Sequence, residues 1–296
     1  MIESFLTKYE ILFHKDVLMK NYTTMGIGGY APFIVTPRSF NEVLEISLFA
    51  KKNNVELKII GNGSNLIVDD KNFHALFLCP LLLKEIEIKN DNVIEAGAGI
   101  SLNSLSSFAA KNGLAGFEWA AGIPGSTGGA VKMNAGAFHF EIKDAVASLT
   151  VLNSQNEIQE LTHDELAFQY RKSFLNPSDI VLKAAFQFTP DDPFLIQSRI
   201  KEFQHRRIAT QPLAEKSAGC IFKNPPGNSA GKCIDQLGLK GYRIGGAVVS
   251  EKHANFIVNR YNATFGDTML LIDYIKDKVN KNYNIELENE VEIWYA

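Results

Sequence analysis

Glycine is concentrated in a stretch near the middle of the chain that also carries small hydroxyl and amide side chains. The stretch runs from Gly122 to Ala130 and is followed by Asn134-Ala-Gly-Ala137. Glycine lets a ligand approach the backbone closely, and successive inward N–H groups form a concave anion site. Two earlier runs, Ile59–Ile67 and Ala96–Gly99, repeat the theme. Three such loops in one half of the chain predict a large phosphate-bearing ligand.

The familiar nucleotide-binding fingerprints do not fit these loops. Gly61-Asn-Gly63 and Gly97-Ala-Gly99 are each followed by leucine where a third glycine should open the helix of a Rossmann fold. Gly227 to Cys233 resembles a P-loop but has one residue too few between its glycines, and cysteine where magnesium needs a hydroxyl. Alone, the Gly61 run favours a simple turn. Combined with the Gly122 stretch, it favours a ligand site of another nucleotide fold.

Three further positions carry groups capable of chemistry. Cys220 lies between a glycine and two apolar residues, as a buried structural thiol does, yet its polar neighbours leave open a thiol that acts as an acid. Arg171 follows a possible capping box, which favours an exposed cation at a helix end. The segment 285–293 alternates apolar residues with four glutamates, most of them expected to be solvated. The basic stretch after residue 200 is either solvated charge or a diphosphate pocket.

The expected elements place the glycine loops at strand ends. Ser39 is expected to cap a helix that runs to about Asn53, and a short strand over 55–60 then delivers Gly61. A strand over 93–96 leads through the Gly97 turn into a helix that ends at Gly113. Ligands can therefore reach the backbone amides of these loops.

Later elements divide the chain and close it. Strict alternation predicts a half-buried strand over 180–188, and Thr189–Pro193 is a plausible boundary. Asp192 and Pro193 then open a helix. Another helix is expected over 267–281, and a final strand over 285–293.

Composition narrows the class of protein. The chain has 296 residues, a formal net charge of −3 and 46% hydrophobic residues, so a bulk electrostatic case for nucleic-acid binding is absent. Three cysteines without metal-binding spacing, and scattered histidines, argue against both a disulfide framework and a metal site. No signal peptide or membrane span is evident. We expect a soluble cytoplasmic protein.

Taken together, the order of motifs resembles the UDP-N-acetylenolpyruvoylglucosamine reductase family, flavoenzymes of peptidoglycan precursor synthesis. The resemblance covers nearly the whole chain, and each motif is weak alone. The motifs are Asn21–Thr24 with Gly28-Gly29, Gly61–Asn65, Gly122–Gly129 with Met133–Ala137, Tyr170-Arg171, Ser217–Pro225, Gly238–Gly241, His253–Asn259 and Leu287–Val291.

This resemblance implies an α+β fold with the FAD-binding arrangement of vanillyl-alcohol oxidase. It implies two FAD-binding subdomains, 1–75 and 76–192, and a substrate-binding domain over 193–296 whose last strand returns to the active site. The connection between Arg171 and the strand that follows it is short, as in the shorter form of the family, which lacks a tyrosine-bearing lid. We expect a monomer without nucleic-acid or membrane partners.

The resemblance also implies non-covalently bound FAD, NADPH as co-substrate, and the enolpyruvyl ether of UDP-N-acetylglucosamine as substrate. Lys223 and Asn224 would contact the substrate, and no metal is expected. The residues implied in cofactor binding are Tyr22, Thr23, Gly61, Asn62, Gly63, Ser64, Asn65, Gly122, Ile123, Pro124, Gly125, Ser126, Gly128, Gly129, Asn134, Ala135 and Gly136.

In such an enzyme hydride from flavin N5 adds to the terminal vinyl carbon, and the resulting enolate needs a cation and a proton-bearing carboxyl group. Arg171 and Glu290 match the family's positions for these roles. Cys220 departs from the family pattern, because most members carry there the serine that protonates the enolate carbon. A thiol ionises at a pKa of about 8.5, far below that of an alcohol, so we predict that Cys220 keeps the donor role.

Two other functions remain open at the level of the sequence. An oxidase of the same fold, acting on an alcohol or a sugar lactone, would turn over with oxygen and without NADPH. A binding or regulatory module would keep the nucleotide pocket without chemistry, which the replacement at Cys220 favours and the presence of both Arg171 and Glu290 opposes.

Overall fold

The computed structural model describes residues 1–296, which divide into two compact units. Unit 1 comprises residues 1–16, 32–62 and 74–205, and unit 2 comprises 17–31, 63–73 and 206–296. These limits differ from the three domains expected from the sequence, which stay a prediction. The division falls inside the long helix α5 (Pro193–Thr210) rather than at Thr189–Pro193. None of the helices is both long and apolar enough to cross a membrane.

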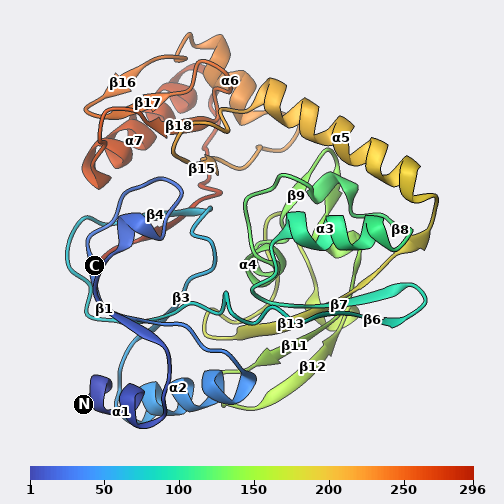
Figure 1. The fold of residues 1–296 in the computed structure, drawn as a ribbon. Coiled ribbons are helices and arrows are strands. Elements are labelled where there is room, and N and C mark those ends of the chain that lie inside the picture. Colours follow the sequence, from blue (N-terminus) through green and yellow to red (C-terminus); the bar gives the residue numbers. More distant parts are fainter. The chain divides into compact units, whose positions relative to one another are not determined.

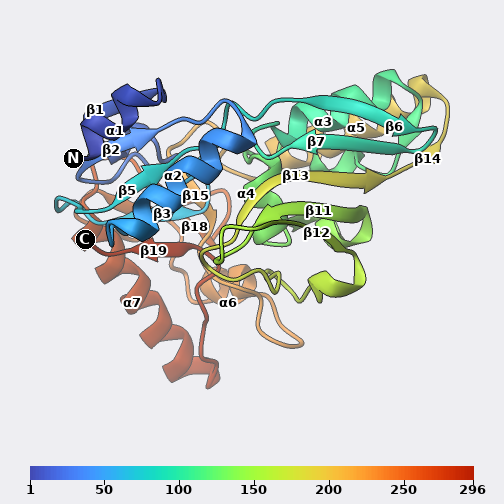
Figure 2. The same cartoon turned by 90° about the horizontal axis from the view of Figure 1, so that it is seen from below.

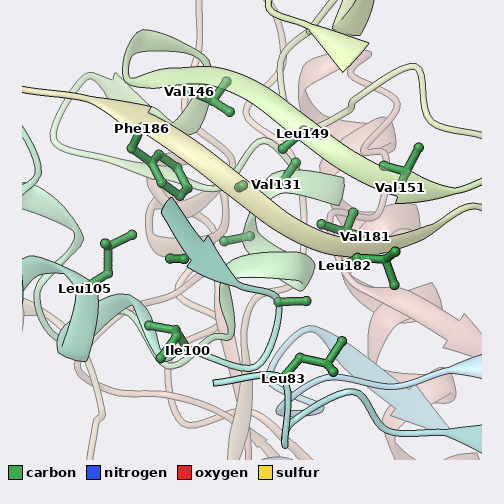
Figure 3. Packing of buried hydrophobic residues seen from close by; sticks show 14 of the residues in the cluster. Leu83, Ile100, Leu105, Val131, Val146, Leu149, Val151, Val181, Leu182 and Phe186 are labelled. Atoms are coloured by element: carbon green, nitrogen blue, oxygen red, sulfur yellow. The ribbon is translucent and has the colours of Figure 1, made fainter. Parts of the chain in front are cut away.

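Unit 1 is built around a five-stranded antiparallel sheet in the order β12-β11-β13-β7-β6 (Figures 1 and 2). These strands are β6 (Ile86–Asn90), β7 (Val93–Gly97), β11 (Val146–Leu152), β12 (Ile158–Thr162) and β13 (Ile180–Gln187). The alternation over 180–188 predicted β13 correctly, and the strand lies at the centre of the sheet. Its side chains and those of β11 pack against Leu105 of α3 (Leu102–Lys111) and Val131 of α4 (Thr127–Lys132), as Figure 3 shows.

A smaller sheet carries the first glycine loop. It has the order β1-β2-β5-β3, and β2 and β3 both run parallel to β5. The predicted helix α2 (Phe40–Lys52) connects β2 to β3, and Ser39 caps it by accepting a bond from the Glu42 amide. The Glu42 carboxylate accepts from Arg38 instead of Ser39, so only half of the expected capping box forms. The strands are β1 (Phe13–Leu18), β2 (Tyr30–Val35), β3 (Leu57–Ile59) and β5 (Leu76–Leu78).

Short elements complete unit 1. Most of them are turns of 3₁₀ helix or two-residue strands that link the larger elements. They are α1 (Ile2–Lys8), β8 (Leu114–Ala115), β9 (Gly136–Ala137), β10 (Phe140–Glu141), β14 (Thr189–Pro190), η2 (Glu118–Ala120), η3 (Ile142–Asp144) and η4 (Asp164–Leu166).

Unit 2 packs a four-stranded antiparallel sheet, β15-β18-β17-β16, against helices α6 and α7 around its own apolar core. The helix α7 was predicted from the sequence and extends two residues further at each end. The elements are η1 (Met19–Asn21), β4 (Leu66–Val68), β15 (Ser217–Cys220), α6 (Ala230–Gln236), β16 (Arg243–Ile244), β17 (Ala247–Val249), β18 (Phe256–Asn259), α7 (Phe265–Tyr283) and β19 (Glu292–Trp294).

The final strand expected over 285–293 is wrong for most of its length. Only β19 forms, paired in parallel with β4, and an isolated bridge joins Asn289 to Phe222. The hydrogen-bond partner of the segment changes between these contacts. The amides of Glu290 and Val291 both donate to the carbonyl of Ile221, whereas the amide of Glu292 donates to the carbonyl of Asn65. The apolar side chains of the segment are still buried against the core, although no continuous ladder of strand hydrogen bonds forms.

Candidate active site

The predicted cofactor loops of unit 1 lie against one another. A side chain added at Gly61 would place its Cβ 2.7 Å from the Oγ of Ser126, so it would displace the Ser126 hydroxyl. Ser126 caps α4, and the next two amides, of Thr127 and Gly128, donate to the carbonyls of Ile100 and Ala98. All three glycine runs found in the sequence therefore meet in one place. The backbone N–H groups of Gly61 and Asn62 are not used in the hydrogen bonds of these loops.

The first glycine loop also contains the point where the chain passes into unit 2. Gly63 has a positive φ of 61°, and a Cβ there would lie 1.9 Å from the carbonyl oxygen of Tyr22. Gly63 accepts a bond from the Thr24 amide at 3.1 Å. The hydroxyl of Thr23 is buried and donates to the Ile27 carbonyl at 2.8 Å. The side chain of Thr23 therefore holds its own loop, and the Tyr22 carbonyl occupies the space that a side chain at position 63 would need.

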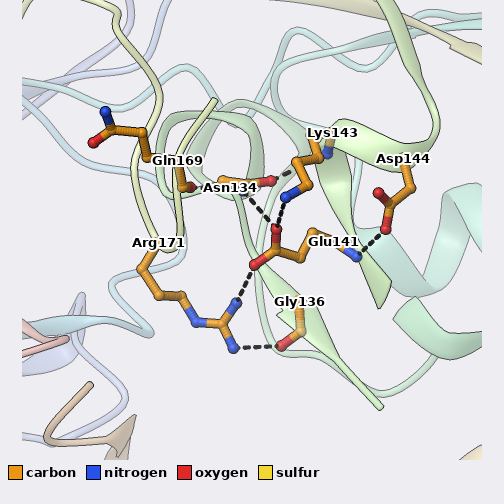
Figure 4. Close-up of polar contacts among 7 residues, drawn as sticks. All are labelled: Asn134, Gly136, Glu141, Lys143, Asp144, Gln169 and Arg171. Atoms are coloured by element: carbon orange, nitrogen blue, oxygen red, sulfur yellow. Dashed lines mark hydrogen bonds and ion pairs between the residues drawn. The ribbon is translucent and has the colours of Figure 1, made fainter. Parts of the chain in front are cut away.

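The predicted cofactor residue Asn134 uses its side chain to join two neighbouring loops. It is fully buried, and its amide nitrogen donates to the Gln169 carbonyl at 2.8 Å and to Glu141 at 3.1 Å, while its oxygen accepts from the Lys143 amide (Figure 4). The buried amide is therefore satisfied by the protein. The backbone of the adjoining Ala135 is also used within the protein, because its amide donates to Ala130 and its carbonyl accepts from Ile142.

Arg171 lies in this same network rather than at a helix end. Its backbone has a positive φ of 57°, and a two-residue turn bridged by Gln169 and Lys172 holds it. The guanidinium donates to the Gly136 carbonyl at 3.1 Å and forms an ion pair with Glu141 at 3.5 Å (Figure 4). It also lies over the ring of Tyr170. Glu165 does accept from the Thr162 amide as a capping box requires, but only the three-residue 3₁₀ turn η4 follows, and it ends at Ala167, which has a positive φ of 35°. Arg171 is thus a half-buried, oriented cation.

Glu141 was not singled out in the sequence, although it organises the network around Arg171. Its carboxylate pairs with Lys143 at 2.7 Å, accepts from Asn134 and faces Arg171. Nothing in the sequence distinguishes it from the other acidic residues. Its contacts come from positions 7 and 30 residues away, which only the fold brings together.

In unit 2 the structure brings Cys220 and Glu290 to neighbouring positions. Cys220 ends β15 and is half-buried, and the next residue, Ile221, accepts the backbone amide of Glu290 at 2.8 Å. Asn65 donates its side-chain amide to the Glu290 carbonyl at 3.1 Å. Ser64 approaches from the same loop, with its carbonyl oxygen 3.9 Å from a Cβ built on Gly219. The second half of the first glycine loop therefore borders the segment that carries Glu290.

Glu290 differs in exposure from the other acidic residues of the last segment. Glu286, Glu288 and Glu292 are exposed, whereas Glu290 is half-buried. The flanking side chains of Leu287 and Val291 are 6% and 4% exposed and anchor the segment in the core of unit 2. Burying a side chain of this size contributes roughly 1.5–3 kcal/mol, which fixes the backbone on both sides of the carboxylate.

Asn255 was not identified from the sequence as a site residue, yet it clamps the chain beside Cys220. It is 4% exposed, and its side chain both accepts from the Phe222 amide at 3.0 Å and donates to the Phe222 carbonyl at 2.8 Å. Its own carbonyl accepts from Ile221. The motif His253–Asn259 contained this residue, but no spacing in the sequence reveals its partner 33 residues earlier.

The two residues expected to contact substrate have partners within unit 2. The ammonium of Lys223 pairs with the exposed carboxylate of Glu288 at 3.1 Å. The side-chain oxygen of Asn224 accepts from the Ala230 amide at 3.1 Å, at the start of α6. The substrate role of both residues stays a prediction, since the Lys223 pair is exposed to solvent and can open at small cost.

Two cavities in the structure are not lined by these reactive side chains. A cavity of about 440 Å³ in unit 2 is lined by Thr23 and Lys216, among others, but not by Cys220 or Glu290. A cavity of about 470 Å³ in unit 1 lies between Arg38 and Lys183 and is not lined by Arg171. No group of three or more His, Cys, Asp or Glu side chains is arranged to hold a metal ion.

His253 makes the stability of unit 2 depend on pH. Burial lowers the pKa of His253 below its ordinary value of about 6.5, and its Nδ1 accepts the amide of Asn255, which requires the neutral ring. The unfolded chain therefore binds a proton that the folded state resists, so the free energy of unfolding falls as the pH drops below about 6.5.

A His253→Gln variant should be less sensitive to acid than the wild type. We expect its midpoint temperature of thermal unfolding to fall by less between pH 7.5 and pH 5.5 than that of the wild type. The same change at exposed His14 is the control, and equal slopes for all three proteins would contradict the prediction.

Comparison with known proteins covers nearly the whole chain. The family model for the C-terminal domain of UDP-N-acetylenolpyruvoylglucosamine reductase matches residues 211–294, and that for an FAD-binding domain matches residues 31–162. Two relatives are named UDP-N-acetylenolpyruvoylglucosamine reductase. The one from Clostridium kluyveri is 40% identical, over 94% of this chain and 91% of its own. The one from Clostridium tetani is 42% identical, over 93% of this chain and 89% of its own.

A solved structure extends the likeness to the fold. The crystal structure of UDP-N-acetylenolpyruvylglucosamine reductase from Thermus caldophilus is 36% identical, covers 96% of this chain and 99% of its own, and superposes with a TM-score of 0.82. Together with the FAD-binding domain match, it confirms the predicted α+β fold class. The resemblance inferred from the motifs is also confirmed: the chain belongs to the UDP-N-acetylenolpyruvoylglucosamine reductase family.

Proposed function

We propose that this protein reduces the enolpyruvyl ether of UDP-N-acetylglucosamine to UDP-N-acetylmuramate, with NADPH as the electron source and FAD as the carrier. The observation that carries the proposal is the near full-length identity of about 40% to enzymes named for this substrate, joined to an FAD-binding domain. The presence of Arg171, Cys220 and Glu290 supports it, because each offers a group that the reaction needs.

The residues of unit 1 fit the diphosphate of FAD. Gly61 and Ser126 leave no room for a side chain between their loops, and the N–H groups of Gly61 and Asn62 remain free to donate. Such clustered donors favour an anion. Gly122, Gly125 and Gly128 would extend this surface. When bound, FAD supplies the ring that accepts hydride from NADPH and passes it to the substrate.

The chain's own residues would manage charge and protons. Hydride addition at the terminal vinyl carbon leaves negative charge on the carboxylate side of the substrate. The guanidinium of Arg171, oriented by Glu141 and Gly136, would stabilise that charge. A protonated Glu290 would donate a hydrogen bond to it. Cys220 would then give its S–H proton to the neighbouring carbon, which completes the reduction of the double bond.

The two substrates, NADPH and the enolpyruvyl ether, would use one cleft in turn. Lys223 and Asn224 would contact the nucleotide sugar. We propose a cytoplasmic monomer. Cys79, Cys220 and Cys233 form no disulfide, which suits a reducing compartment.

The test is a spectroscopic titration of the purified protein without oxygen. We expect a yellow protein that is bleached by one equivalent of NADPH and regains its colour when the enolpyruvyl ether of UDP-N-acetylglucosamine is added. Recovery of colour only on admission of oxygen, together with turnover of alcohols or sugar lactones, would identify an oxidase instead. A colourless protein, or one that NADPH does not bleach, would leave a nucleotide-binding module and contradict the proposal.

A further inference from the structure

The hairpin that contacts Arg171 turns at two residues that are poorly suited to its backbone. Strands β9 and β10 are joined by the two-residue loop Phe138-His139. Both loop residues have a positive φ, of 56° and 70°. Two-residue hairpin loops with such backbone favour Asn-Gly, because a side chain is crowded there and a bulky one most of all. The tip of the hairpin is therefore strained and needs support from outside the loop.

Hydrogen bonds hold the base of this hairpin. The Ile142 amide donates to the Ala135 carbonyl at 2.9 Å. The Glu141 amide donates to the carboxylate of Asp144 at 2.7 Å. The two strands themselves are each only two residues long. Because an isolated two-stranded hairpin is marginal in water, so short a ladder does not by itself fix the tip.

Aromatic rings pack against the tip of the hairpin. The ring centroid of Phe138 lies 5.0 Å from that of Phe203, a residue of α5 within unit 1. The ring of Phe140 meets Phe203 edge-on at 6.4 Å and stacks on Trp119 at 6.3 Å. Trp119 is 2% exposed, and its indole N–H donates to the Gly116 carbonyl at 3.2 Å. Phe203 therefore contacts both the loop and the first residue of β10.

The same hairpin supplies two of the groups that contact the Arg171 guanidinium. The Gly136 carbonyl accepts from it at 3.1 Å, and the Glu141 carboxylate pairs with it at 3.5 Å (Figure 4). A Cβ built on Gly136 would lie 2.9 Å from Nη1 of Arg171, so the hairpin and the guanidinium are in close contact. A shift of the hairpin would therefore move the guanidinium or break these contacts.

We propose that Phe203 is a positioning residue for Arg171 and acts through the β9–β10 hairpin. This inference rests on the proposed function, in which Arg171 stabilises the negative charge that follows hydride addition. The ring of Phe203 keeps the Phe138-His139 loop in its left-handed backbone and so fixes Gly136 and Glu141 beside the guanidinium. The position of the cation matters because it stabilises a developing charge only where that charge forms.

The first test compares the two half-reactions of a Phe203→Ala variant by anaerobic stopped-flow absorbance of the flavin. Flavin reduction by NADPH should keep its wild-type rate. Reoxidation by the enolpyruvyl ether should be about tenfold slower, because a displaced cation loses part of its effect. Phe203→Tyr keeps the ring and should recover most of that rate. The matched control is Phe194→Ala, on the same helix, whose ring is 79% exposed and whose loss should change neither half-reaction.

The strain in the loop provides a second test. His139→Gly relieves part of it, because glycine adopts a positive φ without crowding. Added to Phe203→Ala, this change should restore most of the lost reoxidation rate, since the relaxed loop depends less on the ring. Failure of His139→Gly to restore any of the rate would count against the proposal, because two residues that act through one loop are expected to be coupled.

Hydrogen exchange tests the support of the hairpin without turnover. In Phe203→Ala, peptides covering residues 134–144 should exchange their amides about tenfold faster than in the wild type, whereas Phe194→Ala should match the wild type. Unchanged exchange, or equal losses in both half-reactions, would overturn the proposal. If the enolpyruvyl ether does not reoxidise even the wild type, the proposed function fails, and the exchange rates alone decide whether Phe203 holds the hairpin.

Phe140→Ala replaces Phe203→Ala if the latter does not fold. The Phe140 ring is 45% exposed, so its loss costs the fold less than the loss of a buried ring, yet it removes the contacts with Phe203 and Trp119. The same selective loss of reoxidation and the same faster exchange are expected. Wild-type behaviour of this variant in both measurements would contradict the proposal.

Discussion

A Cys220→Ala variant should still be bleached by NADPH but should reduce the enolpyruvyl substrate about a thousandfold more slowly than the wild type, since general acid catalysis is typically worth 10²–10⁴. Alanine keeps the small volume at the end of β15 and removes the S–H proton. The two half-reactions are separated by anaerobic stopped-flow absorbance of the flavin. The defect is expected only when reduced enzyme meets the enolpyruvyl ether.

The matched comparison is Cys220→Ser, which restores a proton-bearing group of similar size. We expect this variant to turn over within about tenfold of the wild type, because a hydroxyl can serve as a general acid when the site is organised for it. Its pH profile should lack any limb that thiol ionisation produces. Unchanged turnover in Cys220→Ala would return the cysteine to the class of buried structural thiols and make the donor role untenable.

An Arg171→Gln variant should lose about a hundredfold to a thousandfold in turnover, as expected when one preorganised stabiliser of a developing oxyanion is removed. Glutamine is neutral and too short to keep both the Gly136 and Glu141 contacts. The rate of flavin reduction by NADPH should change little, because no negative charge develops on the enolpyruvyl substrate in that step. Single-turnover rates for each half-reaction measure the difference.

Arg38→Gln provides the control for Arg171→Gln. Arg38 is an exposed arginine of unit 1 that pairs with Glu42, so the same change of charge occurs outside the hydrogen-bond network of Arg171 and Glu141. This variant should retain wild-type rates in both half-reactions. Equal losses in the two half-reactions of Arg171→Gln would indicate a disordered cofactor site instead of a lost oxyanion partner.

Local elements were predictable because their signals lie within a few residues. The helix after Ser39, the strand β13, the helix after Asp192 and α7 all follow from caps and periodicity. The helix expected before Arg171 was wrong, because the turn that the capping box starts ends after three residues at Ala167, whose left-handed backbone no cap in the sequence reveals. The strand expected over 285–293 was wrong because alternation records burial and not pairing, and the backbone there changes partners at Ile221.

The sequence by itself determined the family, through the order of its motifs, and the existence of glycine loops suited to an anion. It also supplied the identities of Arg171, Cys220 and Glu290, since side-chain chemistry is a local property. The tertiary structure decided which groups surround them. Glu141 pairs with Arg171, and Asn65 and Ile221 hold the Glu290 backbone. Glu141 lies 30 residues from Arg171 along the chain, and Asn65 lies 225 residues from Glu290. Electrostatic stabilisation depends on distance in space and on burial, and neither is written in the local pattern of residues.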